Sequence, residues 1–337
     1  MLVIDDTCIC ANPGGLEVIN PVGRRRVSCA VHDIDGTHSL IRDWPPVMSR
    51  VLHTVIVEGL PTGYDDSVRI EELSRMVGRE ELPETDLFCI ESAGLSALTQ
   101  MEWAIRMGIE ACTVDLPEYA LTPEDRIANA AAIADIWDGN ECSGHEDPPE
   151  VTAFLHQHAP RLFRFYEKVL NSYCRDSNLE AAGKDPEPWR VRGSMEFLSA
   201  LHGLGVRNYF VTGAVVDDRS PGGIREEVRV LGYDIGPGRV IEAIMGSRWD
   251  TKRPKAEVLQ ALCDELDLDP GEMLIVGDGR AEIRAGRAAG AVTLSRLPRT
   301  ALRGRQIHRT VGTNYIVSEY RPEELGLIMP DIDSHWR

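Results

Sequence analysis

Lysine is scarce in this 337-residue chain: only four lysines occur, and arginine supplies almost all of the positive charge. The 36 basic and 54 acidic side chains leave a formal net charge of −18. A charge of that sign and size disfavours a nucleic-acid backbone or an anionic membrane surface as the main partner. Because lysine is so rare, a lysine that falls within a chemically suggestive motif is more informative than usual.

Other absences narrow the class of protein further. No stretch reaches the roughly 18 apolar residues that a membrane span needs, and the acidic N-terminus has no basic segment of the kind that opens a secretory signal. The eight cysteines are scattered, and the close pair Cys8 and Cys10 has no second pair with which to complete a zinc site. This cysteine usage suits a reducing compartment, so we expect a cytoplasmic protein without a membrane partner.

The most informative segment is the run VSCAVHDIDGT, residues 27–37. Its apolar residues predict a buried strand, and Asp33 and Asp35 point to the same side where that strand ends. Open α/β sheets bind their ligands at this edge. Two carboxylates so close repel, unless a metal ion lies between them or one is protonated as an acid while the other is the nucleophile. Both arrangements suit transfer through an aspartyl phosphate, although DxDGT alone also fits a plain turn.

Two later segments present groups that suit a phosphate. An apolar strand ends in Thr212 and Gly213, where a hydroxyl and backbone N–H groups could hold a phosphate oxygen, although many buried strands end this way. Lys255 follows a proline, which favours the first turn of a helix. The helix dipole disfavours a cation there, which indicates an anionic partner, either Asp33 or a phosphate. Lys252, in the loop just before, is the rival.

A second acid-bearing strand end occurs at LIVGDGRAE, residues 274–282. Here an apolar strand delivers Asp278 into a glycine turn, and Glu282 follows at a helix start. Asp278 could complete a set of oxygen ligands for Mg²⁺, which prefers carboxylates and waters. Glu282 either holds a metal-bound water or is only a favourable acid in the first turn of its helix.

The pattern of apolar residues changes along the chain. Helical periodicity dominates from residue 39 to about 191, whereas strands and helices alternate after about residue 190. The alternation predicts an α/β fold with a doubly wound parallel sheet, and the helical stretch predicts a large insertion after its first strand. We therefore expect a core of residues 1–43 and 190–337 and an inserted α-helical domain of residues 44–189.

In this order, the four segments resemble the haloacid dehalogenase-like hydrolase superfamily of aspartate-nucleophile phosphotransferases. The pattern of that family is DxDGT, a strand ending in Thr or Ser, a Lys, and GDxxx with an acid. The resemblance covers residues 27–43 and 190–320 and implies a Rossmann-like catalytic core, with the insertion as a cap domain and Mg²⁺ as cofactor. DGTHSLIRDW and VGDGRAEI also look like a phosphoglycolate-phosphatase-like subgroup.

The resemblance implies a role for each motif residue. Asp33 would be the nucleophile, Asp35 the general acid and base, and the side chains of Lys255 and Thr212 would neutralise phosphate oxygens. The predicted metal ligands are Asp33, Asp35 through its backbone carbonyl, Asp278 and Glu282. The predicted phosphate or substrate contacts are Gly36, Arg42, Thr212, Gly213 and Lys255.

These motifs predict a Mg²⁺-dependent phosphomonoester hydrolase that acts on a small soluble organic phosphate through an aspartyl-phosphate intermediate. Asp35 favours phosphate esters, because the dehalogenases and phosphonate hydrolases of the family generally lack the second aspartate. A phosphomutase or another phosphotransferase stays open as an alternative, and so does a non-catalytic phosphate-ester-binding module. The sequence also leaves a homodimer open.

A few residues near the motifs allow two interpretations. His38, Arg42 and Trp44 are candidate substrate contacts, with Gln100 on a cap helix. Alternatively, Trp44 packs at the cap hinge and Arg42 forms a surface ion pair. His32 stands where the family usually has an apolar residue. It is either a buried, hydrogen-bonded histidine or a modulator of its neighbour, the predicted nucleophile.

Overall fold

The computed structural model describes residues 2–7, 15–117, 119–140, 147–216, 223–249 and 254–336. Cys8, Cys10 and Lys252 lie outside these ranges. Within them, the strands are β1 (Leu2–Asp5), β2 (Glu17–Val18), β3 (Arg24–Val27), β4 (Cys29–His32), β5 (Arg207–Val215), β6 (Ala243–Ser247), β7 (Met273–Gly277), β8 (Val292–Arg296) and β9 (Tyr315–Val317).

The core is built on a sheet that, among the described residues, has seven strands in the order β2-β9-β8-β7-β4-β5-β6. Strands β4 to β9 pair in parallel, and β2 adds to β9 as an antiparallel edge. Of the parallel strands, β4 comes first in the sequence. Strands β5 and β6 then follow on one side of it, and β7, β8 and β9 follow on the other side. This is the strand order of a doubly wound Rossmann-like fold, and it confirms the predicted fold class.

The central strands are buried on both faces, as parallel sheets require. In β7, Leu274 and Val276 belong to one hydrophobic cluster, whereas Met273 and Ile275 belong to another on the opposite face. The core helices are α8 (Ser194–Gly203), α9 (Ile224–Val230), α10 (Lys255–Leu266), α11 (Arg280–Ala289), α12 (Leu302–Thr310) and α13 (Pro322–Leu325). Short 3-10 helices occur at η2 (Glu187–Trp189), η3 (Pro270–Glu272) and η4 (Asp333–His335).

The buried strand predicted within the run 27–37 is interrupted near its start, at Ser28. The backbone N–H of Ser28 donates to the carbonyl of Glu272 at 3.0 Å, and its own carbonyl accepts from Arg207 at 3.1 Å. Residues before the break pair elsewhere: β3 joins β1 in a separate antiparallel ribbon. The run of arginines in β3 therefore lies outside the main sheet.

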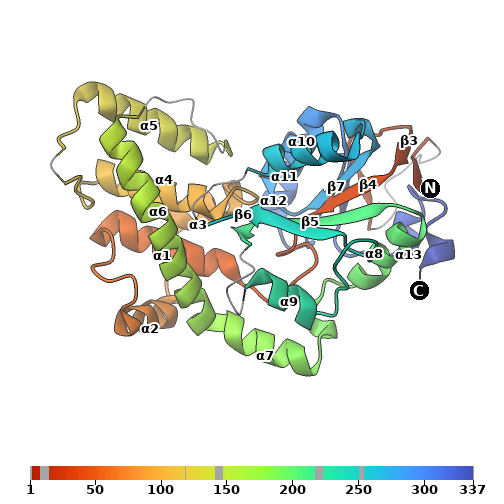
Figure 1. The fold of residues 1–337 in the computed structure, drawn as a ribbon, viewed down its shortest axis with the longest axis horizontal. Coiled ribbons are helices and arrows are strands. Elements are labelled where there is room, and N and C mark those ends of the chain that lie inside the picture. Colours follow the sequence, from red (N-terminus) through yellow and green to blue (C-terminus); the bar gives the residue numbers. More distant parts are fainter. Residues whose placement is uncertain are drawn as a thin grey trace.

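The insertion after β4 is helical, and Figure 1 shows α1–α6 as a lobe beside the sheet. Its helices are α1 (Trp44–Glu58), α2 (Ser67–Met76), α3 (Pro83–Glu91), α4 (Ala97–Glu110), α5 (Pro123–Trp137), α6 (Pro149–Leu170) and α7 (Asp176–Lys184), with a π-helical turn η1 (Asn171–Arg175) before α7. The sequence pattern did not predict α3 or α7.

A hydrophobic cluster of the insertion's own stabilises this lobe. Apart from Val215, its buried members all lie between Val47 and Leu170, and the rings of Phe88 and Trp103 stack at its centre with centroids 3.7 Å apart. The fold is therefore an α/β core with a helical cap. The boundaries at 44 and 189 stay a prediction, because Ala182 of α7 packs in a cluster with core residues.

In the part of the chain that the structure describes, we find no helix long and apolar enough to cross a membrane.

Candidate active site

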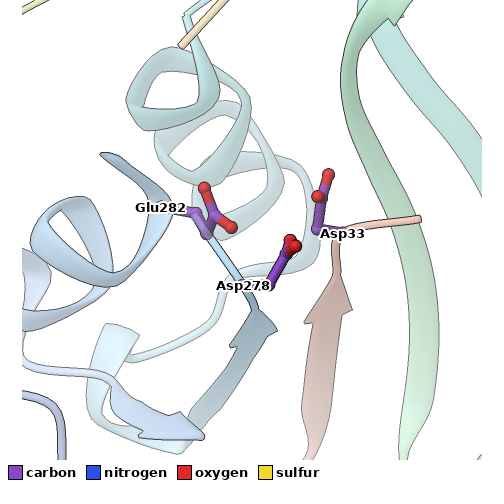
Figure 2. Close-up of side chains that lie close together, drawn as sticks. All are labelled: Asp33, Asp278 and Glu282. Atoms are coloured by element: carbon purple, nitrogen blue, oxygen red, sulfur yellow. The ribbon is translucent and has the colours of Figure 1, made fainter. Parts of the chain in front are cut away.

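The site lies at the carboxyl ends of the adjacent strands β4 and β7. This is the topological switch point of the sheet, where the strand order reverses. His32 and Val276 are register partners, and the backbone N–H of Asp33 donates to the Val276 carbonyl at 2.8 Å. Asp33 and Asp278 therefore leave the sheet side by side. Figure 2 shows their side chains next to each other at the strand tips, with Glu282 beside Asp278. Doubly wound sheets bind ligands at this point.

Three carboxylates and one ammonium group meet here. Oxygens of Asp33, Asp278 and Glu282 all lie within 4.8 Å of one another. The Nζ of Lys255 donates to Asp33 Oδ1 at 2.8 Å and to Glu282 Oε2 at 3.2 Å. We name these four residues the acid cluster. Its formal charge is −2, so a single lysine does not balance it.

The charges within the acid cluster shift one another's pKa values. Burial opposes a charge on Lys255, but Asp33 and Glu282 outweigh it and raise the pKa of the ammonium group above its usual value. Burial and the charges of Asp33 and Glu282 raise the pKa of Asp278 well above its usual value. Burial also opposes the charge on Glu282, yet Lys255 and a backbone N–H of Gly279 lower its pKa. Burial and the charge of Glu282 also raise the pKa of Asp33, although Lys255 opposes the shift. A bound cation would therefore favour the charged form of both Asp33 and Asp278.

Gly36 allows the first motif to approach Asp278 closely. Its φ is +74°, and a Cβ at this position would lie 2.0 Å from Asp278 Oδ2. The hydroxyl of Thr37 donates to Asp278 Oδ1 at 3.2 Å, and Arg296 donates to the Gly36 carbonyl at 2.7 Å. The glycine in DIDGT is therefore required by contact with the second acid-bearing strand end.

Asp35 faces a second group of charges. Burial raises the pKa of Asp35 to about 7, with the charge of Arg42 opposing and that of Glu227 adding to the shift. Its Oδ1 is buried and finds no hydrogen-bond partner among the described residues. A carboxyl group that is half protonated near neutral pH can both give and take a proton, which suits the predicted general acid and base.

Arg42 is buried, so the surface ion pair considered for it is wrong. Its Nε donates to both carboxylate oxygens of Glu227 at 3.0 Å, and its Nη1 donates to Glu167 Oε1 at 2.8 Å. Arg175 also donates to Glu227, at 2.8 Å. We name Arg42, Arg175, Glu167 and Glu227 the arginine cluster. It joins α6 of the cap to α9 of the core, and Arg42's contact with phosphate stays a prediction.

Thr212 and Gly213 lie within β5, on the other side of Asp33. The Thr212 hydroxyl oxygen accepts from the N–H of Ala214 at 3.1 Å, which leaves its own hydrogen available to a ligand. A Cβ on Gly213 would lie 2.6 Å from the carbonyl oxygen of Leu95. Leu95 belongs to the turn between α3 and α4, so the cap approaches the core at this point.

A single cavity brings most of these groups together. Its lining includes the predicted residues Asp33, Asp35, Arg42, Trp44, Gln100, Thr212, Gly213, Lys255 and Asp278. Trp44 also packs against the apolar cluster of the cap. Gly36 and Glu282 stand behind this lining, next to Asp278. The cap residues Phe163, Tyr166 and Glu167 of α6 also line the cavity, and the sequence analysis missed them; only their helical spacing on one face of α6 marked them.

His38 lies away from the cavity. It is fully buried and forms hydrogen bonds with His32 at 3.1 Å and with Ser194 at 2.6 Å, so the expectation that it contacts substrate is wrong. His32 is also fully buried, and burial lowers its pKa to about 3. The interpretation of His32 as a buried, hydrogen-bonded histidine is therefore confirmed.

Among solved structures, the chain is similar to a phosphonoacetaldehyde hydrolase-like protein from Oleispira antarctica. The two share 15% sequence identity over 94% of each chain, with a TM-score of 0.47. A β-phosphoglucomutase from Clostridium difficile has 12% identity over 91% of this chain and 98% of that one, with a TM-score of 0.44. A candidate phosphoglycolate phosphatase from Lactobacillus delbrueckii subsp. bulgaricus has 15% identity over 90% and 99%, with a TM-score of 0.45.

The sequence itself has no match among curated proteins. However, residues 180–290 match the family model described as haloacid dehalogenase-like hydrolase. This stretch contains Thr212, Lys255, Asp278 and Glu282, three of the four motif segments. The likeness to a phosphoglycolate-phosphatase-like subgroup stays a prediction. Residues 180–290 are thus similar to haloacid dehalogenase-like hydrolases, which bears out the resemblance that the motifs indicate.

Proposed function

We propose that the protein is a Mg²⁺-dependent phosphomonoester hydrolase that works through an aspartyl phosphate on Asp33. The observation that supports this most directly is the contact of Lys255 Nζ with Asp33 Oδ1 at 2.8 Å, within a cluster of three carboxylates. A nucleophilic carboxylate beside a fixed cation and further acids is what phosphoryl transfer needs, because positioning and charge stabilisation supply most of the catalysis.

The residues present fit a magnesium ion. Carboxylate oxygens are the ligands that Mg²⁺ prefers, and the acid cluster has an excess of negative charge with a raised pKa at Asp278. Asp33, Asp278 and the backbone carbonyl of Asp35 would hold the ion. Both oxygens of Glu282 already accept hydrogen bonds, from Gly279 and Lys255, so we assign it a supporting position. When bound, the ion would neutralise charge on the transferred phosphoryl group.

Two acids would divide the nucleophilic attack and the proton transfers. A carboxylate oxygen of Asp33 attacks phosphorus while Asp35, protonated at the start, gives its proton to the leaving alkoxide. The carboxylate of Asp35 then takes a proton from a water that attacks the aspartyl phosphate, which restores Asp33 and releases inorganic phosphate. Lys255 and the Thr212 hydroxyl hydrogen stabilise the phosphoryl oxygens throughout.

The cavity indicates a small substrate. Its empty volume is about 560 Å³, including space open to solvent, and it lies between the strand ends and residues of the cap. That size suits a small organic phosphate rather than a protein side chain on a folded surface. A phosphomutase would use the same core, but would need a second hydroxyl of the bound substrate to compete with water at the aspartyl phosphate.

The test is release of inorganic phosphate from a generic aryl phosphate, with and without Mg²⁺. We expect activity that a chelator stops and added Mg²⁺ restores, and loss of essentially all turnover in Asp33→Asn with thermal unfolding unchanged. Activity that survives in chelator would overturn the magnesium requirement. Retention of about a tenth of wild-type activity in Asp33→Asn would show that another group is the nucleophile, since removing a nucleophile usually costs orders of magnitude more.

A further inference from the structure

Two buried histidines bracket the first motif and contact each other. His32 precedes Asp33, and His38 follows Thr37, so the pair stands at the two ends of the DIDGT loop. Their ring nitrogens, Nδ1 of His32 and Nε2 of His38, lie 3.1 Å apart. Both side chains are fully buried, and neither lines the catalytic cavity. The hydrogen bond therefore joins the two ends of the loop outside the lining of the cavity.

The position of the proton on His32 follows from Asn208. The amide nitrogen of Asn208 donates to two backbone carbonyls, of Leu198 at 3.1 Å and of Val240 at 2.9 Å. This fixes the orientation of the amide, so its Oδ1 faces His32 Nε2 at 3.3 Å and can only accept. His32 must therefore carry its proton on Nε2, which leaves Nδ1 as an acceptor toward His38.

The same logic continues through His38. Its Nε2 must donate to His32, so its Nδ1 must accept, and the hydroxyl of Ser194 lies 2.6 Å away to donate. Ser194 in turn accepts from the hydroxyl of Tyr233 at 2.6 Å. Each hydrogen bond in this chain has one permitted direction, and both imidazoles are neutral. Burial favours the same neutral state and lowers the pKa of both rings.

A tyrosine and a backbone N–H extend the network to the backbone of the loop. The hydroxyl of Tyr320 donates to the carbonyl of Thr37 at 3.0 Å, and the backbone N–H of Val191 donates to the carbonyl of His38 at 3.1 Å. The ring of Tyr320 also stacks on that of His38, with centroids 5.3 Å apart and planes 11° apart. The end of the loop is thus held at its side chain and at two successive carbonyls.

We propose that His32 and His38 form a clasp that fixes the conformation of the DIDGT loop, and that both are positioning residues for Asp33 and Asp35. The inference rests on the proposed function for its catalytic consequence, though not for its structure. Apolar side chains could fill the same volume, but they would not impose a direction on each contact as a fully paired polar network does. The loop carries both reacting acids, so a small displacement would affect turnover more than binding.

The catalytic consequence is tested with two substitutions of His38. His38→Phe keeps a ring to stack on Tyr320 but removes both hydrogen bonds, whereas His38→Gln can still donate toward His32. We expect His38→Phe to lower kcat by about 10–100-fold with KM changed less than about threefold, as is usual when a supporting hydrogen bond is lost. His38→Gln should recover most of the loss. A wild-type kcat in His38→Phe would overturn the proposal.

A pair of tyrosine variants distinguishes a loss of catalysis from a loss of stability. Tyr320→Phe removes only the hydroxyl that holds Thr37, while Tyr315→Phe removes an equally buried hydroxyl that donates to Asp6 at 2.6 Å, at the edge of the sheet. Both should lose some stability, but only Tyr320→Phe should lower kcat. Equal kcat values in the two variants would contradict the clasp.

Nitrogen-15 NMR of the wild-type histidines tests the clasp independently of any activity. We expect two neutral Nε2–H tautomers at pH 7, and faster amide hydrogen exchange over residues 36–38 in His38→Phe. An Nδ1–H tautomer or a charged ring at either position would overturn the assigned network. If the NMR result holds and the wild-type protein releases no phosphate, it is the proposed function that fails and not the clasp.

Discussion

Residues of both the acid cluster and the arginine cluster line the same cavity, but the two clusters differ in charge balance. The acid cluster sets three carboxylates against one ammonium group, whereas the arginine cluster sets two guanidinium groups against two carboxylates. The acid cluster needs a further cation to balance its charge, whereas the charges of the arginine cluster balance one another. Asp35 stands between them.

This difference separates a reacting centre from a structural joint. Buried ions are tolerated when each is paired and hydrogen-bonded, which the arginine cluster achieves within the protein. Its members come from the segment after the first motif, from α6, η1 and α9, so it ties cap to core. The acid cluster reaches the same condition only with a ligand, which is where binding free energy can be gained. Three predictions test this distinction and a fourth tests the histidine pair, in order from the largest expected effect to the smallest.

Glu227→Gln should destabilise the fold most. Glu227 is fully buried and accepts from both Arg42 and Arg175, so its loss leaves buried positive charge in excess. Breaking such a pair typically costs about 3–5 kcal/mol, measurable by urea unfolding. The matched control is Glu180→Gln, which removes an exposed ion pair with Lys184 and should leave the unfolding midpoint nearly unchanged. Equal losses in the two variants would refute the structural role.

Lys255→Ala should act on turnover. Loss of an oriented charge at a phosphoryl site typically costs about 10²–10³ in kcat, or about 3–4 kcal/mol. Lys184→Ala, at an exposed lysine far from the cavity, is the control and should leave phosphate release unchanged. If Lys252→Ala proved crippling and Lys255→Ala mild, the phosphate contact would move to Lys252 despite the contact of Lys255 with Asp33.

Mg²⁺ should stabilise the protein through the acid cluster alone. At a concentration of 100 times Kd the gain is about 2.7 kcal/mol, seen as a higher unfolding midpoint. Asp278→Asn should abolish the gain, because it removes one of the carboxylates that would hold the ion. Glu167→Gln, in the arginine cluster, should leave it intact. Stabilisation that persists in Asp278→Asn would place the ion elsewhere.

The smallest effect is a loss of stability in mild acid from the neutral histidine pair. Burial lowers the folded-state pKa of His32 to about 3 and also lowers that of His38, while the unfolded value is about 6.5. The unfolded chain therefore binds protons first. Stability is complete above about pH 6.5 and falls as the pH drops toward the folded values, by roughly 1 kcal/mol per histidine at pH 6. His38→Gln should show a shallower decline; an identical decline would contradict the assignment.

The reacting groups could be predicted from sequence because they depend on local patterns. Asp33 and Asp278 each follow an apolar strand, and Lys255 follows a proline at a helix start, so strand ends and helix ends alone bring them to one edge of a parallel sheet. The doubly wound order followed from the alternation of strands and helices after residue 190. These features are short in range, and the fold preserves them.

The supporting groups could not be predicted, because they depend on contacts across long stretches of chain. Glu227 lies 185 residues beyond Arg42, and nothing in the spacing of either indicates the pair. For Arg42 the sequence therefore predicts either a substrate contact or a surface ion pair, and it predicts a substrate contact for His38. Helix α12, LRGRQIHRT, has no continuous apolar stripe, and packing rather than propensity stabilises it.

The close approach of the turn between α3 and α4 sets a limit on how the site can be redesigned. A Cβ on Gly94 would lie 2.0 Å from Glu282 Oε2, and one on Gly279 would lie 2.6 Å from the backbone of Gly94. Gly213 lies similarly close to Leu95, so the cap and the core meet at three positions that have no room for a side chain. A side chain added at any of these glycines would push the cap away from the core and admit water to the cavity. Changes of substrate are therefore better sought on α6, whose side chains border the cavity without setting its height.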